Sequence, residues 1–337
     1  MRSLMNAINV TAIGEAESLR VSQVPIPTPK ANEVLVRNHA IGVNFVDTQH
    51  RAGQPYPVDL PLILGIEVAG EVVALGAQVS HISLGQRVAI AGHMVGIYAE
   101  YCACPEDVLI PLPDSVGYEQ AASCLLQGMT AHALSHEAYA IQPGDTVLVQ
   151  AAAGGVGSLL TQIAKLRGAT VIGTCSTPAK AAAIRSVGGD SAILYTQTDV
   201  VKEVMHLTNG AGVHAVFDAV GKTTFDAGLE VLRPQGSLVI YGLTSGNVPP
   251  FDINRLSGIA GYSSQGCLSI TWASLSVYNA RREDMLRRAA AVLEWLGEGT
   301  LAVNIAGRLP LEQASKAHHL LENRQVIGKV MLVPQSG

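Results

Sequence analysis

Thr146-Val-Leu-Val-Gln-Ala-Ala-Ala-Gly-Gly-Val-Gly157 is the most informative segment of this chain. An apolar run at 146–149 leads into a glycine-rich turn, and an amphipathic helical pattern begins at Ser158. The turn follows the pattern G-x-G-x-x-G, with an alanine in the place of the first glycine. A strand, a glycine turn and a helix in this order bind a pyrophosphate, because backbone N–H groups and the positive end of the helix face it. We therefore expect a dinucleotide to bind at Ala152, Gly154, Gly155, Val156 and Gly157.

The residues after the next predicted strand indicate which dinucleotide binds. Enzymes that use NAD usually carry Asp or Glu about 20 residues after the glycines, where it binds the ribose 2′-hydroxyl. Here Cys175 and Ser176 occupy that place, and Lys180 lies in the first turn of the following helix. Without a carboxylate nothing repels a 2′-phosphate, and a hydroxyl together with a lysine attracts one. The pattern predicts NADPH; the alternative is that Lys180 is only a solvated helix lysine.

Size and composition restrict the class of protein. The chain has 337 residues, of which 48% are hydrophobic and 15% charged, as expected for a globular protein large enough for two domains. The formal net charge is −5 without a basic stripe, which argues against nucleic acid or an anionic membrane as the main partner. No apolar run approaches the ~20 residues of a membrane-spanning helix. Five scattered cysteines suit a reducing compartment, so we expect a cytoplasmic protein.

The first third of the chain carries β signals. Alternating segments at 34–40, 68–74 and 87–90 predict short strands joined by turns, which is typical of a small β-barrel. A helical stretch at 118–126 then leads through Thr130 to a second helix.

From about residue 142 the pattern changes to alternating strands and helices. Strands are predicted at 146–151, 170–174, 192–195, 214–218 and 237–241, with helices near 156–167, 178–187, 199–208 and 222–232. This alternation predicts a doubly wound parallel sheet, completed by a sixth strand at 267–271. The last strand, 328–333, is expected to return to the first domain. We expect one domain at 1–126, completed by 274–337, and a dinucleotide-binding domain at 127–273.

Five motifs occur in order across nearly the whole chain, at 40–47, 64–70, 151–157, 217–221 and 328–330. With them the chain resembles the medium-chain dehydrogenase/reductase superfamily, and within it the quinone oxidoreductases related to zeta-crystallin. The resemblance implies an α/β protein with a GroES-like β-barrel catalytic domain and a Rossmann domain. It also implies a homodimer that pairs the sheet edge at 266–275 across a two-fold axis.

The resemblance also allows a test for zinc. Zinc alcohol dehydrogenases of this superfamily carry a cysteine where this chain has Asn44 and a histidine where it has Ile66. An isoleucine cannot bind zinc, and an amide is a poor ligand beside thiolate or imidazole. His132 and His136 have a spacing at which they could share a metal, but two ordinary helix histidines are the simpler interpretation. We therefore expect no metal.

The resemblance assigns roles to further residues. It places Asn44 near the nicotinamide and Asp47 behind it on the same short helix, and it places Tyr56 in a loop beside the active cleft. Tyr56 either contacts the acceptor or only packs the loop. Thr130 matches a residue near the nicotinamide half of the cofactor, and Tyr195 matches one that surrounds the 2′-phosphate with Ser176 and Lys180. The cofactor trough is expected to include Val220, Tyr241, Gly242 and Leu243.

Hydride transfer without zinc suits acceptors that spread negative charge over a conjugated system. We therefore expect an NADPH-dependent quinone oxidoreductase acting on a small-molecule quinone. The alternative enzyme is an NADPH-dependent enone or enal reductase, which takes a conjugated carbonyl substrate at a similar site. A non-catalytic role is the third possibility, because relatives of zeta-crystallin serve as lens protein and bind RNA. The negative net charge and the intact phosphate-binding motif argue against it.

Overall fold

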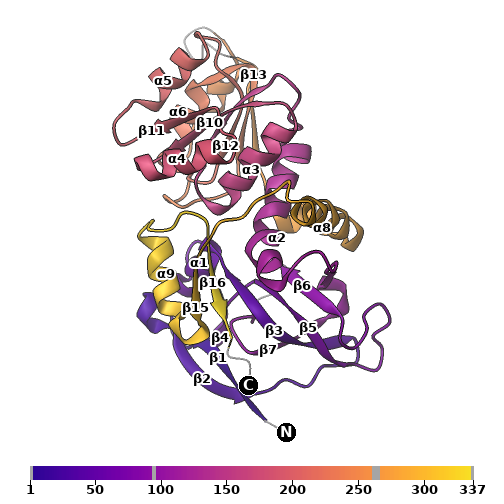
Figure 1. Cartoon of the computed structure of the whole chain (residues 1–337). Helices are drawn as coiled ribbons and strands as arrows, with labels where there is room; N and C mark the ends of the chain where they lie inside the picture. The colour runs from indigo at the N-terminus through magenta and orange to yellow at the C-terminus, as the bar shows by residue number, and fades with distance from the viewer. Residues whose placement is uncertain (1–2, 93–95, 260–265, 335–337) are drawn as a thin grey trace. The chain divides into compact units, whose positions relative to one another are not determined.

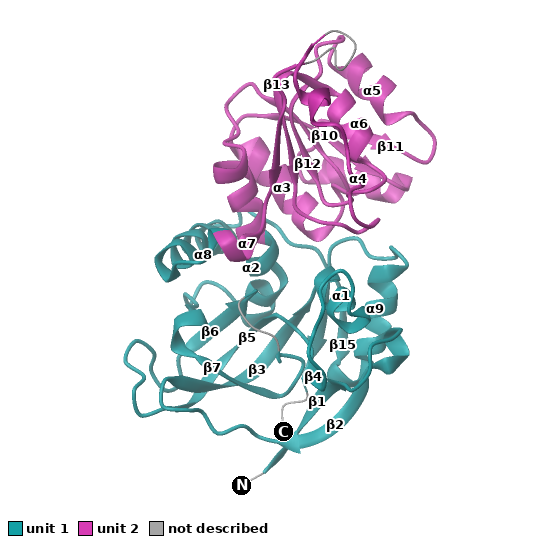
Figure 2. Ribbon diagram, turned by 180° about the vertical axis from the view of Figure 1, so that it is seen from behind, with its two compact units in different colours: residues 1–127, 278–337 teal, residues 128–277 magenta. Residues whose placement is uncertain are grey.

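The computed structural model describes residues 3–92, 96–259 and 266–334. The chain divides into two compact units (Figure 2), with residues 1–127 and 278–337 in unit 1 and residues 128–277 in unit 2. The sequence predicts these boundaries after residues 126 and 273. Unit 1 thus combines an N-terminal and a C-terminal segment.

Unit 1 is built mainly from strands (Figure 1). They are β1 Leu4–Val10, β2 Arg20–Pro25, β3 Glu33–Val43, β4 Leu62–Ile63, β5 Glu67–Leu75, β6 Arg87–Ala91, β7 Tyr101–Pro105, β8 Ile110–Pro111, β15 Ile305–Pro310 and β16 Lys329–Val333. The helices of this part of the chain are α1 Phe45–Ala52, α2 Tyr118–Ala133, α8 Arg282–Gly297 and α9 Ala314–Glu322. One sheet has the order β2-β1-β4, and the larger has the order β15-β16-β3-β5-β6-β8 with β7 paired to β3. This arrangement confirms the β-rich first domain that the sequence predicts.

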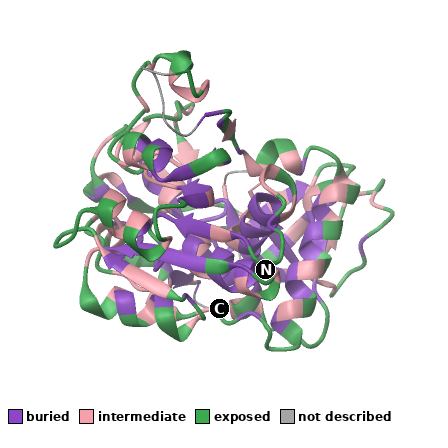
Figure 3. Cartoon of the chain, turned by 90° about the horizontal axis from the view of Figure 1, so that it is seen from above, coloured by how far each residue is buried: buried purple, intermediate pink, exposed green. Residues whose placement is uncertain are grey.

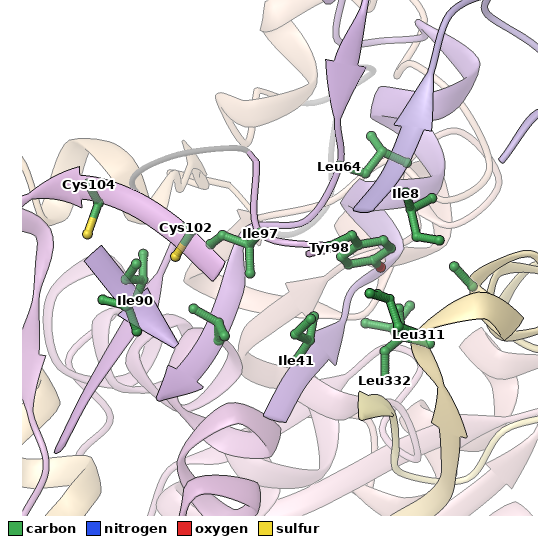
Figure 4. Packing of buried hydrophobic residues seen from close by; sticks show 14 of the residues in the cluster. Ile8, Ile41, Leu64, Ile90, Ile97, Tyr98, Cys102, Cys104, Leu311 and Leu332 are labelled. Carbon is green, nitrogen blue, oxygen red and sulfur yellow. The ribbon is translucent and has the colours of Figure 1, made fainter. Parts of the chain in front are cut away.

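The end of β3 is buried in the apolar core of unit 1. Buried and less buried residues alternate along the first half of β3, but residues 40–43 are all buried. The apolar core packs around the ring of Tyr98, which lies among Ile8, Leu64 and Leu311 (Figure 4) and is fully buried. The segment after β3 therefore begins inside the protein, where polar groups need partners.

Unit 2 contains a six-stranded sheet. Its strands are β9 Thr146–Val149, β10 Thr170–Cys175, β11 Ser191–Leu194, β12 Val213–Asp218, β13 Leu232–Ile240 and β14 Ser269–Trp272. Its helices are α3 Gly155–Leu166, α4 Pro178–Ser186, α5 Val200–Leu207, α6 Phe225–Glu230 and, at the unit boundary, α7 Leu275–Tyr278. The strand order is β11-β10-β9-β12-β13-β14, and all neighbours are parallel. The predicted doubly wound parallel sheet is confirmed, and buried residues concentrate in the strands and on inner helix faces (Figure 3).

Two elements differ from the prediction. The stretch at 118–133 is one helix, α2, rather than two, with Gly128 inside it. A glycine costs a helix only about 1 kcal/mol, and this helix gains more by burying Cys124, Leu125 and Met129. Strand β13 begins at Leu232, earlier than predicted, because it continues past a register shift in its pairing with β12.

Within the described residues, no helix is both long enough and apolar enough to cross a membrane.

Candidate active site

Asn44 lies where β3 ends and α1 begins. Its backbone is extended (φ −119°, ψ 154°), as is usual for the residue before a helix. The Asp47 carboxylate accepts a 2.8 Å hydrogen bond from the Asn44 backbone N–H, which stabilises the first turn. Asn44 is 3% exposed and Asp47 is 0% exposed. The two residues therefore lie together at the buried start of a helix.

The side-chain amide of Asn44 is surrounded by hydrogen-bond partners. Its Nδ2 donates to Glu67 Oε2 at 2.9 Å and to the Gly42 carbonyl at 3.2 Å. Its Oδ1 accepts from Lys329 Nζ at 2.7 Å and from Gln127 Nε2 at 3.3 Å. An amide has two N–H groups and two acceptor lone pairs. All of them are used inside unit 1.

The partners of Asn44 form a buried ion pair. Lys329 Nζ lies 2.6 Å from Glu67 Oε2, and each side chain is 1% exposed. The other carboxylate oxygen of Glu67 accepts from the Leu126 backbone N–H at 2.8 Å. The strand residue beside the pair has to be glycine, because a Cβ on Gly42 would lie 2.1 Å from the Ala122 carbonyl and 2.6 Å from Glu67 Oε2. The packing around the ion pair thus leaves no room for a side chain at position 42.

A second chain of hydrogen bonds leads away from Asp47. Tyr98 Oη donates to Asp47 Oδ2 at 2.8 Å, and His318 Nε2 lies 3.3 Å from Tyr98 Oη. Arg51 Nη1 lies 3.3 Å from His318 Nδ1 and donates to Glu322 Oε2 at 3.2 Å. Because an arginine only donates, His318 accepts at Nδ1 and carries its proton on Nε2. From His318 onward the donors therefore point toward Asp47, since His318 Nε2–H donates to Tyr98 Oη and Tyr98 donates to Asp47.

Burial controls the protonation of this chain. It raises the pKa of Asp47 to about 7, against the lowering effect of the hydrogen bonds from Asn44 and Tyr98. Burial and the charge of Arg51 lower the pKa of His318 to about 3. Burial also raises the pKa of Tyr98, as does the neighbouring Asp47. Near neutral pH, Asp47 is the group in this chain that changes its charge.

Tyr56 has a more open environment. It lies in the loop that follows α1 and is 40% exposed. Its ring meets that of His50 edge to face, with 6.1 Å between the ring centroids. Burial lowers the pKa of His50, so this imidazole is neutral at pH 7. The loop thus presents an accessible phenol next to a neutral imidazole.

The glycine turn of unit 2 has the geometry of a phosphate site. Helix α3 begins at Gly155, and Gly154 precedes it in extended conformation. The first N–H groups of a helix have no partner within the helix, and a glycine offers no side chain to cap them. A Cβ on Gly157 would lie 2.6 Å from the Ala151 carbonyl, so this close turn requires glycine. Ala152, fully buried, anchors the turn by donating its N–H to the Thr174 carbonyl at 3.1 Å.

The residues predicted to bind the 2′-phosphate lie together in unit 2. Lys180 Nζ is 3.5 Å from Ser176 Oγ. The Tyr195 backbone N–H donates to the Cys175 carbonyl at 3.1 Å, and its side chain is 42% exposed. Thr196, which the sequence did not indicate, donates its hydroxyl to the Ser176 carbonyl at 3.2 Å. This surface offers hydroxyl groups and an ammonium ion without a carboxylate at position 176.

The remaining predicted cofactor residues lie at the carboxyl ends of neighbouring strands. The Val220 N–H donates to the Asp218 side chain at 2.6 Å, and the Tyr241 N–H donates to the Asp218 carbonyl at 2.9 Å. The first contact closes the turn after β12, and the second brings this turn next to Tyr241 after β13. Ligands bind in α/β sheets at this edge, where the strand order reverses. Thr130 lies in α2 and is half buried.

Several residues of the buried network were not among the sequence predictions: Arg51, Glu67, Tyr98, Gln127, His318 and Lys329. Lys329 did give a signal, since it is a charged residue in an otherwise apolar strand sequence, and Glu67 is one of two glutamates in a strand that is otherwise apolar. The other four have no local pattern that distinguishes them.

The two histidines with a spacing at which they could share a metal, His132 and His136, lie side by side. The rings of His132 and His136 stack in parallel, with 4.0 Å between their centroids. Throughout the described ranges, no three His, Cys, Asp or Glu side chains are grouped so that they could hold a metal ion.

Comparison with known proteins identifies the family. The model "Alcohol dehydrogenase GroES-like domain" matches residues 30–114, and "Zinc-binding dehydrogenase" matches residues 155–287. The chain is 37% identical to a quinone oxidoreductase of Pseudomonas aeruginosa, with 97% of this chain and 99% of that protein covered. It is 36% identical to a 2-haloacrylate reductase of Burkholderia sp., with 93% and 94% covered. The crystal structure of Escherichia coli quinone oxidoreductase complexed with NADPH gives a TM-score of 0.92 at 35% identity, covering 98% of this chain and 100% of that one. With this likeness over nearly its whole length, the chain belongs to the quinone oxidoreductase family of the medium-chain dehydrogenase/reductase superfamily.

Proposed function

We propose that this protein is an NADPH-dependent quinone oxidoreductase that works without zinc. The observation that carries the proposal is the likeness to quinone oxidoreductases over nearly the full length, including one solved with NADPH. The reaction adds a hydride and a proton to a quinone and yields the hydroquinone. Residues of unit 2 support the binding of NADPH, and residues of unit 1 support a reaction without a metal.

Unit 2 has the features that NADPH requires. The uncapped start of α3 at Gly155 suits the pyrophosphate. Ser176 and Lys180 suit the 2′-phosphate, which an NAD-type carboxylate at this place would repel. When bound, the cofactor supplies the hydride. The protein itself binds and orients both reactants and excludes water.

Unit 1 supports a reaction without a metal. The positions at which zinc relatives carry a cysteine and a histidine hold Asn44 and Ile66. The Asn44 amide is bonded to a lysine ammonium, which supplies a positive charge but no free ligand position. A conjugated acceptor needs no Lewis acid, because its own π system spreads the incoming charge. We propose that Tyr56, accessible in its loop, shapes the acceptor side.

A second candidate is reduction of an activated alkene, such as an enone or enal. The 36% identity to a 2-haloacrylate reductase over 93% of the chain favours it specifically. The two candidates share the cofactor site and differ in the atom that receives the hydride.

A substrate panel tests both candidates. Purified protein is mixed with NADPH or NADH and with small quinones, enones, enals and 2-haloacrylate, and oxidation of the cofactor is followed at 340 nm. We expect quinones to be reduced fastest and NADPH to be preferred. If quinones are inert while an alkene is reduced, the second candidate replaces the first. If no acceptor is reduced, both proposals fail.

We further propose a cytoplasmic homodimer. The dimer is proposed because β14 is an edge strand of the sheet of unit 2 and carries the half-exposed Trp272. An edge strand presents unpaired backbone groups that a second copy can pair with. A monomeric mass by light scattering at micromolar concentration would remove this proposal.

A further inference from the structure

We propose that Lys329 is a positioning residue for the reaction. Its buried ammonium holds the side-chain amide of Asn44, and through Asn44 the first turn of α1, in a single orientation. The kinetic part of the test rests on the proposed reductase function, whereas the structural part does not.

The first step is that Asn44 has no free hydrogen-bonding group. Its two N–H groups bond Glu67 and Gly42, and its oxygen bonds Lys329 and Gln127. A residue that is 3% exposed and fully bonded has nothing to offer an acceptor molecule. Asn44 therefore acts on the reaction through the turn that it begins.

The second step is that Lys329 fixes which way the amide points. An ammonium ion only donates, so the 2.7 Å contact requires the amide oxygen to face Lys329. The Nδ2 group must then face Glu67, whose oxygen at 2.6 Å from Nζ completes a closed triangle of three side chains. Charge-assisted hydrogen bonds are stronger than neutral ones. Without the ammonium, the oxygen keeps only the longer contact of 3.3 Å with Gln127.

The third step connects the amide to α1. The Asn44 N–H is bonded to Asp47, and Asp47 is bonded to Tyr98. The amide and this N–H belong to the same residue, so a displacement of Asn44 that follows the loss of the ammonium disturbs the start of the helix whose C-terminal end leads into the loop of Tyr56. Since misplacement by about 1 Å costs a reaction on the order of 100-fold, a small shift of this turn lowers turnover without touching the phosphate-binding residues of unit 2.

The test uses the double variant Glu67→Gln/Lys329→Met. It removes both charges of the pair, retains similar side-chain volumes and leaves no unpaired buried charge. We expect kcat to fall roughly 10- to 100-fold, while the Kd for NADPH changes less than about twofold. Wild-type kcat in the folded double variant would overturn the proposal, and so would a loss confined to NADPH binding.

A matched control separates stability from positioning. Arg288 is another buried cation of unit 1, 1% exposed and bonded to Asn279 Oδ1 at 2.6 Å. Arg288→Met is expected to lower thermal stability but to retain kcat. If it lowers kcat as much as the double variant does, the effect belongs to buried cations in general and the proposal fails.

Chemical rescue supplies a test that does not depend on the double variant. In Lys329→Ala, added ammonium or methylammonium is expected to restore kcat in a saturable way, because these ions refill the space of the lost group. Tetramethylammonium cannot donate a hydrogen bond and is expected to have no effect. Rescue by all three ions alike, or by none, would contradict the proposal.

A structural readout does not require turnover. A crystal structure of the double variant is expected to show changed partners for the Asn44 amide or a displaced turn at residues 44–48. An unchanged amide and turn would overturn the positioning role even if the wild-type protein proves to reduce neither quinones nor alkenes.

Discussion

Asp47 gives the protein a pH-dependent stability that one substitution removes. The residue is 0% exposed, and burial raises its pKa to about 7. In the unfolded chain an aspartate has a pKa of about 3.9 and is fully ionised above pH 6. Between pH 4 and pH 7 the folded protein therefore binds one proton more than the unfolded chain. The resulting stabilisation is lost as the pH rises through 7.

The size of the effect follows from the two pKa values. For a folded pKa of about 7, raising the pH from 6 to 8 reduces the free energy of unfolding by about 1.4 kcal/mol. His318 acts in the opposite direction, because its lowered pKa costs stability as the pH falls below its unfolded value of about 6.5. In the difference between wild type and Asp47→Asn, the contributions of His318 and of the other titratable groups to the pH dependence of the unfolding free energy cancel. The stability difference between the two proteins should therefore shift by about 1.4 kcal/mol in favour of the variant between pH 6 and pH 8.

Urea unfolding at pH 6, 7 and 8 measures this difference. The chain has two tryptophans, so a Trp272→Phe background leaves Trp295, in the same unit as Asp47, as the fluorescent reporter. Asp114→Asn is the control, since the Asp114 side chain is fully exposed and its removal should leave the pH profile of wild type unchanged. A difference between wild type and Asp47→Asn that stays constant from pH 6 to pH 8 would refute the reasoning.

Three further substitutions test other parts of the molecule. Lys180→Ala should weaken NADPH binding by about 1–3 kcal/mol and leave NADH binding nearly unchanged, measured by fluorescence titration; equal losses would make Lys180 merely structural. Tyr56→Phe should change the ratio of kcat/KM values between quinones while the NADPH Kd stays constant, since the phenol is accessible and lies in unit 1; an unchanged ratio would mean that Tyr56 only packs its loop. Gly42→Ala should cost about 3 kcal/mol of stability in chemical denaturation, because its Cβ would lie 2.1 Å from the Ala122 carbonyl; a variant as stable as wild type would show that the backbone adjusts freely.

The sequence predicted unit 2 more fully than unit 1, for a physical reason. A strand, turn and helix are adjacent in sequence, so the segment at 146–166 contains its own structural signals. Ser176 and Lys180 are likewise only one helical turn apart, and the structure does place them 3.5 Å from each other. In unit 1 the pairing of strands distant in sequence decides the arrangement. Gln127, Tyr98 and His318 have no local pattern that marks their role.

The position of Lys329 depends on strand pairing that the sequence does not reveal. The sequence singles out Asn44 and Ile66 as positions where zinc relatives carry ligands, and it indicates a family motif at 328–330 within a predicted strand at 328–333, without a role for Lys329. Strand β16 pairs antiparallel with β3, with Val330 opposite Val43. In that register the residue before Val330 lies next to the residue after Val43, which brings Lys329 to Asn44 across 285 residues of sequence. Asn44 and the buried ammonium of Lys329 therefore belong to one local arrangement. In it an amide bonded to a fixed cation occupies a position that zinc relatives give to a metal ligand.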